Sequence, residues 1–454
     1  MLFAAHDPAT GRRLSAQRGY DAAAVERTLA AATRAQAAWR RTAPAARARL
    51  LRALARALRA EAPALAALAT AEMGKPIAQA SAEVMKSAVL CDHYAARAAA
   101  LLAPERPPGA PAEAHVVFEP LGTVLAVMPW NFPVWQIVRA AVPALLAGNA
   151  VLFKPAPNVP GSARAVARVF AAAGFPPGLF QVLFVEADAV AGVLADPRVH
   201  AVTLTGSTAA GKAVAAAAAA AMKPGVFELG GSDAAIVLAD ADLDRAAETG
   251  AHARLLNSGQ SCVCAKRFIV VRSVLREFER RFVARMAARR VGDPTDPATE
   301  VGPLARADLR AKLAAQVDAS VRLGAKVLLG GAPLPGPGFF YAPTVLTGVR
   351  AGMPAADEEL FGPVAAILPV RDEAEAIRVA NASRYGLSAS LFTRSRARAK
   401  KLIPQLEVGA VFVNDFVRST PELPFGGTKE SGYGRELGAW GVRAFANVKT
   451  VWLA

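Results

Sequence analysis

The sequence predicts an α/β protein built on parallel sheets, and three observations support this prediction. From residue 124 onward, apolar runs typical of buried strands alternate with helical segments, which is the pattern of βαβ units. At 454 residues the chain is long enough for two or three domains. A hydrophobic content of 54% supplies enough apolar side chains for large cores.

The first hundred residues favour helices. Alanine, leucine and arginine recur at helical spacing over residues 22–39 and 44–73. Pro63 is expected to kink or split the second of these segments. The next helix is expected to run through Cys91, whose apolar neighbours indicate packing in the core. A proline-rich linker is expected at residues 104–111.

The strand predictions rest on short apolar runs bounded by turn residues. They fall at residues 115–120, 124–128, 151–153, 181–185, 201–204, 235–238, 268–271, 411–414 and 449–453, with further runs near Leu328 and Ile367.

Gly206 and Ser207 form a turn between the strand at 201–204 and an alanine-rich helix that reaches Met222. A strand, a Gly-Ser turn and a helix N-terminus together suit an anion such as a phosphate. The motif is weak by itself, because an ordinary βα turn contains the same residues.

Cys262 lies in a turn of small and polar residues just before the buried strand at 268–271. A small molecule can reach a thiol in such a turn, and neighbouring backbone N–H groups can face a developing oxyanion. A lone cysteine in a reducing compartment is more often a packing residue. The choice between the two interpretations therefore depends on the rest of the chain.

Composition excludes several classes of protein. The net charge of +16 is spread along helices without a basic run or an aromatic-rich basic patch, so no nucleic-acid partner is expected. No apolar run reaches the length of a membrane span, and no signal peptide is apparent. Three cysteines do not form a disulfide framework, which favours a cytoplasmic location. No metal site is expected.

Seven motifs occur in the order typical of the aldehyde dehydrogenase superfamily, and together they span nearly the whole chain. They are residues 129–133, 154–155, 206–207, 228–231, 259–262, 359–363 and 424–432. The chain therefore resembles this superfamily, and within it the bacterial NAD(P)-dependent succinate-semialdehyde dehydrogenases. The resemblance implies two Rossmann-type parallel-sheet domains and a small β oligomerisation element.

The resemblance also implies the catalytic residues. Cys262 would attack the aldehyde carbon, and the Asn131 amide with the Cys262 backbone N–H would bind the oxyanion. Glu228 would be the general base that activates water to hydrolyse the thioester. A carboxylate beside a thiol in a semi-buried tunnel is expected to have a raised pKa.

The cofactor positions follow in the same way. Lys154 and Glu359 would bind ribose hydroxyls, Ser207 of the Gly206 turn would meet the pyrophosphate, and Trp130 and Phe361 would lie beside the cofactor.

Pro157 stands where many NAD-preferring members have a glutamate that binds the adenosine ribose. Proline does not repel a 2′-phosphate, and Lys154 could pair with one. The cofactor is therefore expected to be NADP or NAD.

The implied substrate contacts are Trp135, Arg139 and Ser419. Trp135 and Arg139 share one face if their segment is helical. Arg139 could then bind the far carboxylate of a short semialdehyde. Glu422 departs from the expected pattern and would weaken attraction for an anionic substrate.

The predicted domains are a cofactor-binding domain (1–106 and 121–227), a catalytic domain (228–426) and an oligomerisation element (107–120 and 427–454). The resemblance implies a homodimer or homotetramer, joined by a C-terminal strand added to a neighbour's sheet.

Three other readings stay open. The enzyme could act on other aliphatic aldehydes or semialdehydes; it could pass the acyl group to coenzyme A, although Glu228 argues against this; or it could bind a cofactor without catalysis.

Cys264 either packs in the core or forms a disulfide with Cys262. The disulfide assumes an extended segment and a Cys262 thiol of low pKa.

Overall fold

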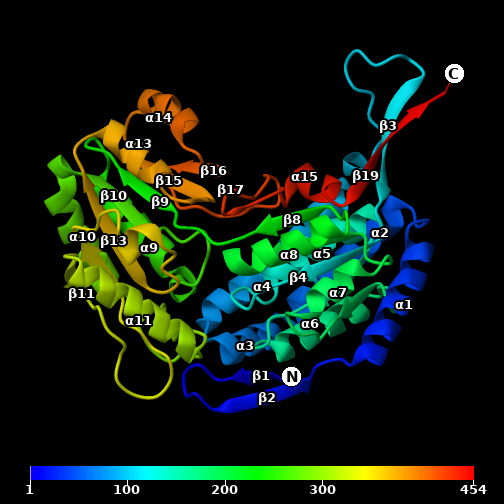
Figure 1. Ribbon diagram of the computed structural model, residues 1–454, viewed down its shortest axis with the longest axis horizontal. Coiled ribbons are helices and arrows are strands. Elements are labelled where there is room, and N and C mark those ends of the chain that lie inside the picture. The colour runs from blue at the N-terminus through cyan, green and yellow to red at the C-terminus, as the bar shows by residue number, and fades with distance from the viewer. Residues whose placement is uncertain (1, 454) are drawn as a thin grey trace.

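The computed structural model describes residues 2–453, which form two large sheets with helices on both faces and a projecting arm (Figure 1). This confirms the predicted α/β class. Among the described residues, no helix has the length and apolar character needed to cross a lipid bilayer.

The first sheet has the strand order β18-β8-β7-β4-β5-β6 within the described chain, and all its pairs are parallel except β18–β8. Its strands are β4 (Thr123–Val127), β5 (Ala150–Lys154), β6 (Phe180–Val182), β7 (Ala201–Thr205), β8 (Gly225–Glu228) and β18 (Gly432–Tyr433). Strand β6 is shorter than expected and ends at Val182.

Helices cover both faces of this sheet. They are α1 (Ala22–Trp39), α2 (Pro44–Ala60), α3 (Ala62–Met73), α4 (Ile77–Leu101), α5 (Trp135–Ala147), α6 (Pro160–Ala172), α7 (Ala189–Ala195), α8 (Thr208–Ala220) and α15 (Gly438–Arg443). The split at Pro63 is confirmed, because α3 begins with this proline in its first turn. Cys91 is fully buried, which confirms its predicted place in the core.

The second sheet has the order β11-β12-β13-β10-β9-β15-β16 within the described chain, and only β11 runs antiparallel to its neighbour. Its strands are β9 (Ala234–Val237), β10 (Arg267–Val271), β11 (Lys326–Leu329), β12 (Thr344–Thr347), β13 (Val364–Val370), β15 (Ser388–Phe392) and β16 (Ala410–Val413). Its helices are α9 (Leu243–Leu255), α10 (Leu275–Ala287), α11 (Ala307–Arg322), α12 (Pro354–Asp357), α13 (Glu373–Asn381) and α14 (Arg396–Leu402).

Alternate side chains of the second sheet enter two different cores. Ile236 and Ile269 pack in the core on one face, whereas Val237 and Phe268 pack in the core on the other. Because both faces are buried, these strands are continuous apolar runs. This is why the sequence alone could predict them.

The arm consists of β3 (Ala114–Pro120) paired antiparallel with β19 (Ala446–Trp452), and it stands out from the body (Figure 1). The N-terminal strands β1 (Leu2–His6) and β2 (Arg13–Arg18) form a separate hairpin, and β14 (Tyr385–Gly386) pairs with β17 (Thr428–Lys429). Strand β18 lies in the segment assigned to oligomerisation but joins the first sheet. The exact domain boundaries stay a prediction.

Candidate active site

Cys262 lines two cavities at once. One has a volume of about 340 Å³ and is also lined by Asn131 and Ser207. The other has a volume of about 400 Å³ and is also lined by Trp135 and Arg139. A thiol in this position can meet one molecule from each cavity.

The first cavity gathers most of the residues predicted to bind a nucleotide cofactor. Its lining includes Trp130, Gly206, Ser207, Glu359 and Phe361. Ser207 caps α8, since its hydroxyl accepts a hydrogen bond of 3.3 Å from the Ala210 N–H. The free N–H groups of this helix end suit a pyrophosphate.

Lys154 and Pro157 lie at the same edge of the sheet but are not among the cavity-lining residues. Lys154 ends β5 and pairs with Val127 at the end of β4, while Val127 pairs with Leu204 of β7 on the other side. The carboxyl ends of these parallel strands therefore meet, as they do where α/β sheets bind ligands. Lys154 is buried, which lowers its pKa, and Pro157 is exposed.

The segment before Cys262 has a backbone that only some residues tolerate. Asn257 and Ser258 have φ values of 56° and 54°, and Gly259 follows with 75°. A Cβ on Gly259 would lie 2.2 Å from the Gly362 carbonyl oxygen, so glycine is required there. This segment then leads into a turn in which the Cys264 N–H donates to the Ser261 carbonyl.

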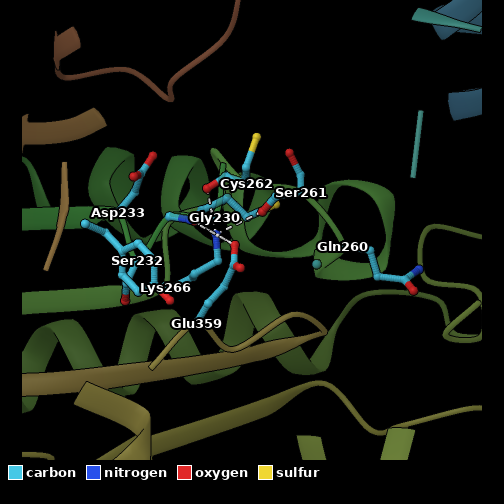
Figure 2. Close-up of polar contacts among 12 residues, drawn as sticks. Gly230, Ser232, Asp233, Gln260, Ser261, Cys262, Lys266 and Glu359 are labelled. Atoms are coloured by element: carbon cyan, nitrogen blue, oxygen red, sulfur yellow. Dashed lines mark hydrogen bonds and ion pairs between the residues drawn. The ribbon is translucent and has the colours of Figure 1, made fainter. Parts of the chain in front are cut away.

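Two fully buried cations hold this loop from within. The Lys266 ammonium donates to the carbonyl oxygens of Ser261 (2.9 Å) and Cys262 (2.7 Å), and Arg254 donates to Gly259 (2.6 Å). Figure 2 shows Lys266 between the loop and Glu359, with the Cys262 sulfur pointing away from it. Lys266 lies 3.6 Å from a Glu359 oxygen, which connects the thiol loop to the cofactor cavity.

Asn131 lies against the same loop. Its Nδ2 donates to the Gln260 carbonyl at 3.0 Å, and the backbone carbonyl of Asn131 accepts from the Asn257 side-chain amide at 2.8 Å. These bonds fix the amide beside the turn that carries Cys262, where a donor to an oxyanion is needed.

The resting thiol is neutral. Burial raises the pKa of Cys262 to about 12, although the charges of Lys266 and Arg139 oppose this effect. The expected low pKa is therefore wrong for this state, because the cavity desolvates the sulfur more strongly than its cations stabilise a thiolate.

Glu228 ends β8 and is buried. Burial raises its pKa well above the ordinary value, and the neighbouring Glu436 raises it further, whereas Arg139 and Arg435 oppose both effects. Among the described residues, neither oxygen of Glu228 has a hydrogen-bond partner. A buried carboxylate with unused acceptors and a raised pKa suits a general base.

The aldehyde dehydrogenase family model matches residues 2–451. The chain belongs to the aldehyde dehydrogenase family. Six of the seven motifs contribute residues to the two cavities or the loop between them, and the motif at 154–155 lies at the adjacent edge of the first sheet.

Three similar proteins have a named activity. The succinate-semialdehyde dehydrogenase [NADP(+)] 1 of Mycobacterium ulcerans is 52% identical over 389 residues, covering 85% of each chain. The succinate-semialdehyde dehydrogenase [NADP(+)] of Mycobacterium avium is 51% identical, covering 85% of this chain and 82% of its own. The crystal structure of succinic semialdehyde dehydrogenase from Streptococcus pyogenes with NADP+ superposes with a TM-score of 0.96 at 35% identity, covering 99% of both chains.

The second cavity of this aldehyde dehydrogenase contains the predicted substrate residues Trp135, Arg139 and Ser419. Arg139 is buried and has an internal partner, since its Nε lies 2.6 Å from Glu436. It also donates to the Thr205 hydroxyl at 3.2 Å. Its binding of a substrate carboxylate stays a prediction, and the ion pair reduces the charge that it offers.

Sequence reasoning missed several residues of this aldehyde dehydrogenase site. They are Lys86, Arg254, Lys266 and Glu436. Lys266 directly precedes β10 and Arg267 begins it, and charged residues beside such a buried apolar run could have indicated these positions from the sequence. The sequence around Lys86 and Glu436 contains no such signal, because the residues that they contact are distant in the chain.

The segment around Cys264 is a turn rather than an extended strand. The Cys264 thiol donates to the Leu256 carbonyl at 3.4 Å and is buried. A disulfide with Cys262 stays a prediction, but the extended segment that it assumed is a turn in the structure.

Proposed function

We propose that this aldehyde dehydrogenase oxidises succinate semialdehyde to succinate, with NADP as the preferred cofactor. The observation that carries the proposal is the position of Cys262 between an anion-binding cavity and a cavity lined by cations. The relatives named above share the activity, and their similarity supports extending it to this chain.

The residues of the first cavity fit a nicotinamide nucleotide. The α8 N-terminus faces it, and a Cβ on Gly230 would lie 2.7 Å from a Glu359 oxygen, so the glycine leaves that carboxylate room. When bound, the nucleotide supplies the hydride acceptor. Glu359 would bind a ribose, and Trp130 and Phe361, whose ring centres lie 5.8 Å apart in an edge-to-face contact, would lie beside the nucleotide.

Each protein group in the site has a separate role in the reaction. Cys262 gives up its proton to solvent in the cavity and its sulfur attacks the aldehyde carbon, while the Asn131 amide and the Cys262 N–H donate to the oxyanion of the thiohemiacetal. Loss of hydride leaves a thioester on the sulfur. Glu228 takes a proton from water as the water oxygen attacks the thioester carbon, and cleavage of the carbon–sulfur bond releases the acid and returns the Cys262 thiolate.

A panel of aldehydes with both cofactors tests the proposal. Succinate semialdehyde with NADP is expected to give the highest kcat/KM in the panel. Higher values for uncharged aldehydes would assign a general aliphatic aldehyde dehydrogenase. Added coenzyme A is expected to yield no acyl-CoA, and its formation would assign the CoA-acylating reaction.

Pro157→Glu is expected to shift preference toward NAD by about 1–3 kcal/mol, the range for opposing a charge-assisted bond. The added carboxylate would repel a 2′-phosphate held by Lys154. The measurement is kcat/KM with each cofactor, and Pro157→Gln is the uncharged control. An equal change in both variants would contradict a role for charge at this position.

We also propose that the arm joins copies of the chain into a homodimer or homotetramer, in a reducing cytoplasm. The arm is too narrow to bury its own side chains. Val448 and Trp452 are each 59% exposed, and β19 pairs only with β3 among the described residues. Its free edge is suited to adding a strand to another sheet.

Deleting residues 447–454 is therefore expected to yield a monomer by light scattering, while far-UV circular dichroism still reports a folded α/β protein. A matched control deletes residues 1–6, which removes β1 and leaves the arm intact. A truncated chain that keeps its oligomeric state would contradict the proposal.

A further inference from the structure

The substrate cavity is lined by four lysine and arginine side chains, and three of them have a carboxylate partner. Lys75 pairs with Glu83, Arg139 with Glu436 and Arg418 with Asp415. Within residues 2–453, the ammonium of the fourth, Lys86, has no carboxylate oxygen within 4.0 Å.

Lys86 is nevertheless held in a defined place. It projects from α4, its Nζ donates to the Ser419 hydroxyl at 3.0 Å, and it lies 4.2 Å from the centre of the Trp135 ring. These contacts come from three separate parts of the chain. An aromatic face and a hydroxyl orient an ammonium without neutralising it, so its charge stays available to a ligand.

We infer that Lys86, beside the already predicted contact Ser419, supplies the free charge of the subsite that binds the far carboxylate of the substrate. This inference rests on the proposed function and names the charge that selects its substrate class. An ω-carboxylated aldehyde would extend from Cys262 to Lys86 within the one cavity, with the carboxylate as the missing counter-ion. Arg139 contributes less, because Glu436 already partners it.

The subsite has a pH dependence. Burial, assisted by the charges of Arg139 and Arg418 and opposed by Glu83, lowers the pKa of Lys86 to about 8. Lys75 and His252 also line the cavity. The ammonium loses its charge as pH rises through this pKa. The wild-type KM for succinate semialdehyde should therefore rise above about pH 8, and that for uncharged butyraldehyde should not follow it.

The variant test compares Lys86→Met with wild type on these two four-carbon aldehydes. The methionine keeps the length of the side chain and removes its charge. We expect KM for succinate semialdehyde to increase about 10- to 100-fold, the range for losing a charged hydrogen bond, and far more than for butyraldehyde. Lys86→Arg should recover part of the loss.

Lys401→Met is the matched control, because Lys401 is exposed on α14 and its loss changes the net charge equally. An equal increase in KM for both aldehydes, or the same shift in the control, would overturn the inference. Should Lys86→Met fail to fold, the wild-type pH profile decides, and parallel KM profiles for the two aldehydes would overturn it.

The same measurements distinguish a failure of the proposed function from a failure of the Lys86 assignment. If wild type does not favour succinate semialdehyde over butyraldehyde, the substrate is wrong, and the subsite with it. If wild type does favour it and Lys86→Met keeps the same preference, only the assignment of Lys86 is wrong.

Discussion

Glu228→Gln is expected to produce a burst of about one equivalent of reduced cofactor per active site, followed by turnover slowed on the order of 10²–10⁴-fold. The glutamine fills the same space but cannot take a proton from water. Acylation of Cys262 therefore proceeds, whereas the thioester is hydrolysed slowly. Stopped-flow absorbance of the reduced nicotinamide measures both phases.

The control for this prediction is Cys262→Ala, which should abolish both the burst and the turnover. A Glu228→Gln enzyme that turns over like wild type would show that another group activates the water. A burst slowed as strongly as the turnover would show that Glu228 also takes the proton of the Cys262 thiol, whose pKa of about 12 calls for a base.

The pH profile of wild-type turnover should agree with this assignment. Burial raises the pKa of Glu228, and only its ionised form acts as a base. The ionised fraction increases with pH, so kcat should rise from acid toward neutral and alkaline pH.

Arg139→Ala is expected to lower the free energy of unfolding by about 3–5 kcal/mol, the cost of leaving one member of a buried ion pair alone. Arg139 and Glu436 are 3% and 2% exposed, and the variant leaves Glu436 without its cation beside Glu228. Urea denaturation measures the change. Because Arg139 lowers the pKa of Glu228, its loss should also move the rise of kcat to higher pH.

A second substitution distinguishes the ion pair from substrate binding. Glu436→Gln added to Arg139→Ala removes the unpaired charge and should recover much of the lost stability. A different result, a raised KM for succinate semialdehyde alone with stability and pH profile intact, would assign Arg139 to the substrate carboxylate, as its place in the sequence suggests.

Local patterns in the sequence determined most of the fold. Residues 22–39 form a helix with the expected bounds, and Pro63 divides the next one. The parallel strands were readable because they are buried on both faces. The turn at Gly206 that follows β7 and the placement of Cys262 before β10 also follow from neighbouring residues.

Only the tertiary structure determined which charged side chains of the site are paired and which groups are ionised. Arg139 stands on an apolar helix, and only the fold brings Glu436 from the far end of the chain to meet it. Lys86 and Ser419 are 333 residues apart in sequence and 3.0 Å apart in space. The thiol of Cys262 is neutral because the protein packed around it desolvates the sulfur. Desolvation and ion pairing depend on every group packed around a side chain, whereas helical and strand periodicity depend only on its neighbours in the chain.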